Sequence, residues 1–138
     1  MHCSYLGCGY TYNRFEGTIT SPNYPSDYLD NTKCENFIHV GFNKTIRITF
    51  KDFKTESGSD HLSFFDYGNG KYEQAKTFSG DVLPESFTSV SNRMKIIFTT
   101  DHSSTYRGFE LTYMEGTLAW ISGKHNSSKK WRSYLFSF

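Results

Sequence analysis

The sequence predicts an all-β protein, specifically a two-sheet antiparallel β-sandwich. Three stretches, 46–51, 94–99 and 109–114, alternate apolar and polar residues with the period of two that is typical of a strand with one buried face. Clusters of Gly, Asn and Ser separate these stretches, as turns do. The body of the chain contains no convincing helical stretch. Several short strands without helices are expected to bury their apolar faces against one another in two packed sheets.

Six strands are expected in chain order. The first is the short Thr-Ile-Thr run that follows Gly17, and two shorter runs rich in Phe, Ile and Val supply the second and fourth. The three alternating stretches supply the third, fifth and sixth. The expected strands are 18–20, 35–40, 46–51, 61–65, 94–99 and 109–114. No internal repeat is visible, so these strands are expected to form one domain.

The expected domain covers residues 8–115, after an N-terminal segment 1–7 and before a tail at 116–138. The tail is basic and aromatic, has no acid, and shows no sustained alternation, so a poorly ordered extension is favoured over a membrane contact. The tail has four Lys and Arg residues and therefore a charge of +4. Since the whole chain has a net charge of +1, the remaining residues 1–115 have a net charge of −3 and are mildly acidic. The absence of a basic face on the body argues against a nucleic-acid partner.

The amino-terminal stretch, MHCSYLGCGY, has no basic-then-apolar signal peptide, and no apolar run reaches the roughly 20 residues that cross a bilayer. If the protein acts outside the cell, its targeting segment is expected to lie upstream or to have been removed. The chain has 18% aromatic and 21% charged residues, a composition that indicates a folded core rather than a disordered chain.

The stretch from Gly17 to Cys34, GTITSPNYPSDYLDNTKC, contains two of the three prolines. A proline restricts the preceding residue to extended backbone, so Ser21 and Tyr24 are expected to be extended and the segment rigid. Tyr28 follows within the same stretch. A functional site is expected near this segment, with Tyr24 and Tyr28 close to it.

Three cysteines are present: Cys3, Cys8 and Cys34. A bridge from Cys8 to Cys34 would close a loop of about 27 residues, worth roughly 3.5 kcal/mol by the chain-entropy estimate. Three reduced thiols in a cytosolic protein are the alternative, and the cysteine count alone does not decide between them. N-x-S/T triplets at Asn43 and Asn126 are possible glycosylation sites and favour secretion weakly.

Enzymatic motifs are scarce. The pairs Asp60-His61 and Asp101-His102 contain residue types found in catalytic triads, but adjacent side chains on an extended chain point to opposite faces. The sequence has no nucleophile elbow, P-loop, dinucleotide fingerprint or H-E-x-x-H motif. Its histidines and cysteines lack the paired spacings of a zinc site. A non-catalytic function is therefore expected.

Three acids lie in expected loops: Glu56, Asp60 and Asp101. If the strands that precede these loops are neighbours, the carboxylates meet at one end of the sandwich and raise one another's pKa unless a cation neutralises them. Calcium suits loop carboxylates together with a backbone carbonyl such as that of Ser103. The alternative is that the acids of the loop after residue 53 are ordinary solvated residues, and the residues alone leave the two readings even.

A series of elements resembles a CUB domain over residues 8–114. In order, the elements are Cys8, GTITSPNYPSDY, Cys34, ITFKDFKTE, DHLSFFD, IIFTTDHS and Arg107-Gly108-Phe109. The resemblance implies a two-sheet antiparallel β-sandwich, an extracellular or secreted setting, a Cys8–Cys34 bridge, and a binding role without catalysis. It also implies that the chain is part of a larger multidomain protein.

The resemblance further implies a calcium site. Matching position by position assigns Glu56, Asp60, Asp101 and the carbonyl of Ser103 to the ion, and assigns Tyr28 to bracing the acids by hydrogen bonding. In such modules the calcium-bound carboxylates receive a lysine or arginine of a partner protein, which is the geometry of a charge-assisted hydrogen bond. Tyr24 matches a motif position that implies a packing role.

The chain departs from the family pattern in three places. The positions of a second family disulfide are Ser57 and Ser79, so that bridge is absent. The segment between Glu56 and Asp60 is shorter than in calcium-binding members. Cys3 precedes the first family cysteine and is a candidate for pairing with an upstream module.

The alternative function is that of a calcium-free, spermadhesin-like member that binds protein or glycan through exposed aromatic and strand surfaces.

Overall fold

The stretches that alternate apolar and polar residues all form strands in the computed structural model, which describes residues 8–117. The three clearest stretches lie in β4 (Lys44–Lys54), β8 (Arg93–Thr99) and β9 (Gly108–Thr117). The shorter runs lie in β2 (Glu16–Thr20), β3 (Lys33–His39) and β5 (His61–Gly68). All six expected strands are therefore present.

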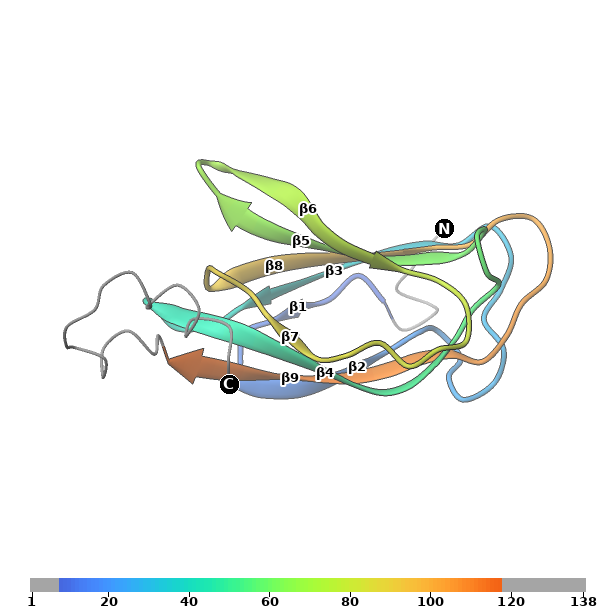
Figure 1. Cartoon of the computed structure of the whole chain (residues 1–138), viewed down its shortest axis with the longest axis horizontal. Helices are drawn as coiled ribbons and strands as arrows, with labels where there is room; N and C mark the ends of the chain where they lie inside the picture. Colours follow the sequence, from blue (N-terminus) through green and yellow to red (C-terminus); the bar gives the residue numbers. More distant parts are fainter. Residues whose placement is uncertain (1–7, 118–138) are drawn as a thin grey trace.

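The strands form two packed sheets, as Figure 1 shows. One sheet has the order β1-β3-β8-β5-β6 and the other the order β2-β9-β4-β7. Every neighbouring pair is antiparallel except β1 and β3, which are parallel. The predicted two-sheet antiparallel β-sandwich is confirmed. Within residues 8–117 there is no helix of the length and apolarity that a membrane span requires.

Three strands were not predicted from the sequence. β1 (Thr11–Tyr12) and β7 (Phe87–Thr88) have only two residues each, too few for a periodic pattern. β6 (Lys71–Phe78) is longer, but it lies at the edge of the five-stranded sheet and six of its eight residues are exposed. An edge strand without a buried face carries no alternation of apolar and polar residues.

The core between the sheets is aromatic as well as aliphatic. Phe50 makes edge-to-face contacts with Phe53, Phe64 and Phe78, with ring centroids 5.4 to 6.0 Å apart. Such contacts contribute to stability beyond the area they bury. The high aromatic content of the chain is therefore in part a property of its core.

A disulfide joins Cys8 to Cys34, and both cysteines are buried. The bridge that the resemblance implied is thus present, and it ties the start of the described chain to β3. Asn36, two residues further along β3, accepts hydrogen bonds through Oδ1 from the amides of Gly9 and Tyr10, at 2.9 and 2.8 Å. The first residues of the domain are held by both covalent and polar contacts.

Hydrogen bonds connect the two loops that carry Ser57 and Ser79. The amide of Gly58 donates to Ser79 Oγ at 3.0 Å. Thr55 and Gly80 form two further bonds, from the Thr55 amide to the Gly80 carbonyl and from the Gly80 amide to Thr55 Oγ1. The loops that a second family disulfide would join are therefore in contact without it.

The expected domain boundary after Glu115 falls inside β9. This strand continues to Thr117, which pairs with Lys44, so residues 116 and 117 are part of the four-stranded sheet. Asn43 is exposed in the turn before β4, and its glycosylation stays a prediction. Cys3, Asn126, the segment 1–7 and the rest of the tail lie outside the described residues.

Candidate metal centre

The three predicted acids lie at one end of the sandwich, but the route that brings them together differs from the expected one. β4 and β8, the strands that precede the acidic loops, belong to opposite sheets rather than lying side by side. Asp60 comes immediately before β5, and the first residue of β5, His61, pairs with Thr99 at the end of β8. Asp60 and Asp101 are thus close because β5 and β8 are neighbours.

The carboxylates of Glu56, Asp60 and Asp101 form a tight cluster, called here the acidic cluster. Each contributes one oxygen, and these oxygens all lie within 4.8 Å of one another. Glu56 and Asp101 are half-buried, whereas Asp60 is completely buried. The structure therefore brings together the three side chains that the sequence singled out.

Asp60 is held by hydrogen bonds on both of its oxygens. The hydroxyl of Tyr28 donates to Oδ2 at 2.6 Å, and the amide of Asp101 donates to Oδ1 at 2.9 Å. The Tyr28 oxygen also accepts the amide of Glu56 at 3.1 Å. Tyr28 is 1% exposed, so it connects Asp60 to the Glu56 backbone from inside the protein.

The short segment from Glu56 to Asp60 is a single turn. The carbonyl of Glu56 accepts the amides of Ser59 and Asp60, at 3.2 and 3.1 Å, and Gly58 has a φ of 81°. A left-handed residue of this kind is favourable for glycine, which has no Cβ. The turn places both acids on the same side of the cluster, so the shortened segment still presents both carboxylates.

Burial raises the pKa of Glu56 above its ordinary value, and the negative charges of Asp101 and Asp60 raise it further, whereas a hydrogen bond from Ser104 acts in the opposite direction. The pKa of Asp101 is lowered, mainly because the amide of Ser103 donates to its Oδ1. Ser104 was not predicted, because nothing in the run of residues 103–105 distinguishes one hydroxyl from another. Among residues 8–117 no lysine or arginine forms an ion pair with the cluster, and the positive charge of His102 makes only a smaller contribution to lowering the pKa of Asp101.

One oxygen of the cluster has no partner in the described part of the chain. Glu56 Oε1 is buried and accepts no hydrogen bond there. Buried polar atoms in proteins are nearly always satisfied by a protein group, a water or an ion. An oxygen-only donor set with an unsatisfied carboxylate oxygen is suited to a hard divalent cation such as calcium.

Two further residues were predicted to belong to the site. Tyr28 hydrogen-bonds to Asp60 and to the Glu56 amide, and its role in bracing a metal site stays a prediction. Ser103 is exposed and its amide donates to Asp101 Oδ1 at 3.2 Å, while the role of its carbonyl oxygen as a ligand stays a prediction.

The proline-containing segment was predicted to be extended, but the structure shows that it is not extended throughout. The amide of Tyr24 donates to the carbonyl of Ser21, the amide of Ser26 donates to that of Asn23, and the Tyr24–Pro25 peptide bond is cis. The segment therefore forms consecutive turns after β2. These turns place Tyr24 at a position that sequence reasoning did not anticipate.

Tyr24 is the hydrogen-bond donor of a second polar group rather than a packing residue alone. Its hydroxyl donates to Asp52 Oδ2 at 2.6 Å. The guanidinium of Arg107 donates to both oxygens of Asp52, with distances of 2.7 and 2.8 Å. This Tyr24–Asp52–Arg107 group was missed because its members are far apart in the sequence and no local pattern connects one of them to another.

The comparisons with known proteins agree with this architecture. The CUB domain family model matches residues 8–113. Protein SpAN of Strongylocentrotus purpuratus is 39% identical over 111 residues, covering 78% of this chain and 18% of that protein. Cubilin of Rattus norvegicus is 34% identical over 121 residues, covering 84% of this chain and 3% of that protein. The chain therefore spans a small part of these relatives.

A solved structure has the same arrangement. The MASP-1 CUB2 domain bound to Ca²⁺ superposes with a TM-score of 0.68 at 26% identity, covering 78% of this chain and 98% of that domain. The family match covers most of the present chain, and the two-sheet fold and the Cys8–Cys34 bridge accompany it. The chain belongs to the CUB domain family.

Proposed function

We propose that this domain is a non-catalytic, calcium-dependent protein-binding module that presents its acidic cluster to a lysine or arginine of a partner. CUB domains are generally binding modules without catalytic activity, which supports this class of function. The small share of SpAN and cubilin that the chain spans supports a place within a larger multidomain protein. The disulfide and the family membership favour an extracellular location.

The observation that carries the proposal is the unsatisfied oxygen Glu56 Oε1 within a cluster of three carboxylates. Without a cation, burial of this oxygen beside two other acids is unfavourable. The Ca²⁺-bound MASP-1 CUB2 domain supports calcium as the ion. Glu56, Asp60 and Asp101 would hold the ion through their side chains, and Ser103 through its carbonyl oxygen.

The protein's own residues orient the site before a partner arrives. Tyr28 and the amide of Asp101 direct the two oxygens of Asp60, and the turn from Glu56 to Asp60 fixes Glu56 relative to it. A bound calcium ion would supply the positive charge that keeps all three acids ionised. Carboxylate oxygens held in this way can accept charge-assisted hydrogen bonds from an ammonium or guanidinium group.

Calcium titration tests the metal site. At about 1 mM calcium, a dissociation constant of about 0.1 to 1 mM, as in extracellular modules, adds about 0.4 to 1.4 kcal/mol to the free energy of unfolding. We expect a rise of a few degrees in the melting temperature of the parent protein, and no rise for Asp101→Ala. Asp66→Ala removes a carboxylate near the opposite end of the β5 strand and should retain the calcium response. An unchanged melting temperature of the parent protein in millimolar calcium would refute the proposal.

A peptide titration tests the basic anchor. A short peptide with one central lysine should shift the amide resonances of residues 56–60 and 101–103 when calcium is present. The same peptide with its lysine acetylated should leave these resonances in place, because acetylation removes the charge. Equal shifts with and without calcium would contradict calcium-dependent docking.

A second candidate function has its own observation. The outer face of the five-stranded sheet carries aromatic rings with cations over them. Arg93 lies over Tyr67 at 4.5 Å, and Lys95 lies over Phe65 and Tyr72, at 5.1 and 5.3 Å. This face favours the calcium-free alternative, in which aromatic and strand surfaces bind protein or glycan. If that alternative holds, Phe65→Ser weakens partner binding and Glu56→Ala leaves it unchanged.

A further inference from the structure

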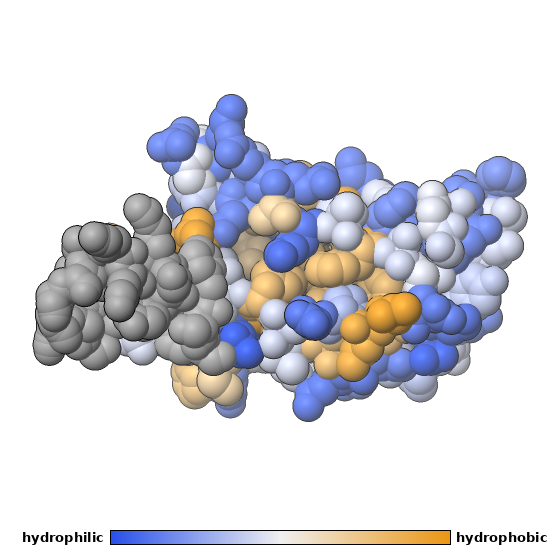
Figure 2. All heavy atoms as spheres, viewed as in Figure 1, coloured by the Kyte–Doolittle hydropathy of each residue, from blue (hydrophilic) through white to orange (hydrophobic). Residues whose placement is uncertain are grey.

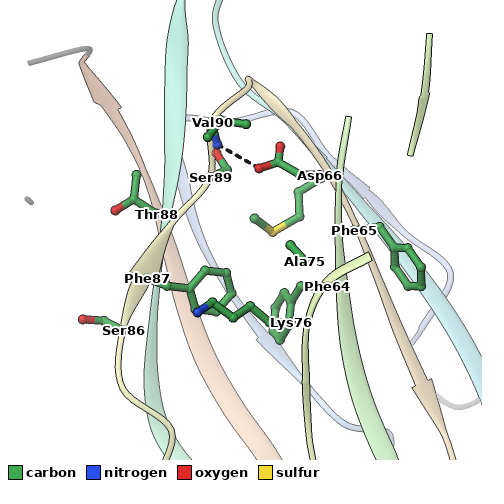
Figure 3. Close-up of a pocket in the computed structure, with 11 residues that line it drawn as sticks. Phe64, Phe65, Asp66, Ala75, Lys76, Ser86, Phe87, Thr88, Ser89 and Val90 are labelled. Carbon is green, nitrogen blue, oxygen red and sulfur yellow. Dashed lines mark hydrogen bonds between the residues drawn. The ribbon is translucent and has the colours of Figure 1, made fainter. Parts of the chain in front are cut away.

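A cavity of about 370 Å³ lies between the edges of the two sheets, on the opposite side of β5 from the aromatic outer face. Figure 3 shows residues of β5, β6 and the segment around β7 arranged around it. Its inner wall is formed by Phe64 and Met94, which are buried, and by the half-buried Phe87. Its volume is at the lower end of the range for small-ligand pockets.

A β-bulge accounts for the space. Phe64 pairs with Lys76 and Phe65 pairs with Gln74, so Ala75 is an extra residue on β6 that has no partner on β5. A bulge bends the strand that contains it. In Figure 1 the tip of the β5–β6 hairpin bends away from the four-stranded sheet. That sheet ends at β7, which has only two residues and does not fill the gap.

The open space exposes apolar surface. Figure 2 shows apolar residues gathered on this face of the molecule, between the hairpin and the four-stranded sheet. Val90 lines the cavity and is 58% exposed. Contiguous apolar surface in a concave position is typical of a binding site.

The cavity has different polar groups at its two ends. At one end Asp66 is fully engaged, because its oxygens accept the amides of Val90 and Tyr67 and the hydroxyl of Ser91. At the other end the ammonium of Lys76 lies over the ring of Phe87, with Nζ 5.6 Å from the ring centroid (Figure 3). Lys76 makes no ion pair with an acid among residues 8–117. The cavity therefore combines an apolar body with one available positive charge.

We propose that this cavity binds a small monocarboxylate with an aliphatic or aromatic body. The body would lie against Phe64, Phe87 and Val90, and the carboxylate would pair with the ammonium of Lys76. An anion complements Lys76, whereas a cationic ligand would meet uncompensated repulsion at the same position. The proposal concerns a different part of the domain from the acidic cluster and does not depend on calcium.

Decanoate, below the concentration at which it forms micelles, is a suitable probe, with decanol as its uncharged match. Titration of the full chain, followed by amide and methyl resonances, should shift signals of Phe64, Ala75, Phe87 and Val90. Decanol should bind about 2-fold to 5-fold more weakly, the difference expected for an exposed ion pair. Shifts confined to other regions, or decanol binding as tightly as decanoate, would overturn the proposal.

Two substitutions separate the head of the ligand from its body. Lys76→Met keeps the apolar stem and removes the charge, so it should reduce decanoate affinity to that of decanol and leave decanol affinity within about 2-fold. Lys71→Met, on the same strand, removes a lysine that pairs with Glu73 outside the cavity and should change neither affinity. Val90→Ser should weaken both ligands by similar factors. Equal effects of Lys76→Met and Lys71→Met on decanoate affinity would contradict the proposal, because they would show only general charge attraction. Self-association that increases with protein concentration and blocks decanoate would also overturn it, and would assign the cavity to a second copy of the chain.

Discussion

Two tyrosines from one short segment make nearly identical hydrogen bonds in different electrostatic surroundings. Tyr24 donates to Asp52 and Tyr28 donates to Asp60, each at 2.6 Å. Asp52 also receives two hydrogen bonds from Arg107. Asp60 instead lies beside two further carboxylates, those of the acidic cluster. The first group is electrically balanced within the protein and the second is not.

The pKa values follow this difference. The guanidinium of Arg107 lowers the pKa of Asp52 to about 2, and the hydrogen bond to Asp52 raises the pKa of Tyr24 to about 12. In the acidic cluster, burial and the neighbouring carboxylates raise the pKa of Glu56 instead. Pairing with a cation makes Asp52 harder to protonate, whereas burial and like charges make Glu56 easier to protonate. Asp101, in the same cluster, keeps a lowered pKa mainly because the amide of Ser103 donates to it.

Burial increases the contrast. The side chain of Asp52 is 24% exposed and that of Arg107 is 45% exposed, so water screens their ion pair. Asp60 is completely buried, where uncompensated charge is more costly. The Tyr24–Asp52–Arg107 group can thus have a purely structural role. In the acidic cluster, by contrast, the fold holds three carboxylates close together although their negative charges repel one another. Such clusters are often functional.

Gly108→Ala should have the largest effect, because it disturbs both groups at once. Gly108 follows Arg107, has a φ of 87°, and a Cβ there would overlap the side chain of Ser21 and lie 3.3 Å from the Tyr28 ring. We expect a loss of about 3 to 5 kcal/mol in the free energy of unfolding, measured by urea denaturation.

Gly70→Ala is the matched control for that substitution. Gly70 has a φ of 82°, and a Cβ there would have no heavy atom within 4 Å. It therefore reports backbone strain without a collision and should cost about 1 kcal/mol. Equal costs at the two glycines would mean that the close approach of the Gly108 backbone to the tyrosine segment is unimportant.

Tyr28→Phe should cost more than Tyr24→Phe, although each removes one hydroxyl. Loss of the Tyr28 hydroxyl leaves buried Asp60 Oδ2 and the Glu56 amide without that partner, for an expected cost of about 2 to 3 kcal/mol. Asp52 keeps Arg107 when Tyr24 is changed, so about 0.5 to 1 kcal/mol is expected there. Urea denaturation of the two variants without calcium provides the comparison. Similar costs would contradict the distinction drawn between the two aspartates.

The sequence was sufficient for the main features of this fold because the central strands have one face in the core and one outside. In β8, for example, Met94, Ile96 and Phe98 are buried and the residues between them are not. β6 could not be predicted, because an edge strand that bends away from the core has no buried face to leave a pattern.

The acidic cluster was accessible to sequence reasoning because its three acids immediately follow, or lie close behind, recognisable strands. The way in which the fold brings these acids together could not be predicted, because it depends on the pairing of β5 with β8, whereas β4 lies in the other sheet. The partnership of Asp52 with Arg107 was also out of reach. Their separation is 55 residues, and Asp52 follows a register shift in β4 that local alternation does not predict.

Acid titration of stability should show the smallest effect of these predictions. It isolates the contribution of the Tyr24–Asp52–Arg107 group to the free energy of unfolding. The folded-state pKa of Asp52 is about 2, below its ordinary value of 3.8, so its contribution to stability is fully present well above pH 4 and is lost as the pH falls through 2. The shift corresponds to at most about 2.4 kcal/mol, and screening at the exposed Arg107 reduces the expected contribution to about 1 kcal/mol. Asp52→Asn removes the titrating group but keeps an oxygen that can accept the hydroxyl of Tyr24. The difference in free energy of unfolding between the parent protein and Asp52→Asn should therefore shrink by about 1 kcal/mol between pH 5 and pH 2. Since the acidic cluster is the same in both proteins, its own titration cancels in this difference, and a gap that stays constant with pH would show that the Arg107 pairing does not shift the pKa of Asp52.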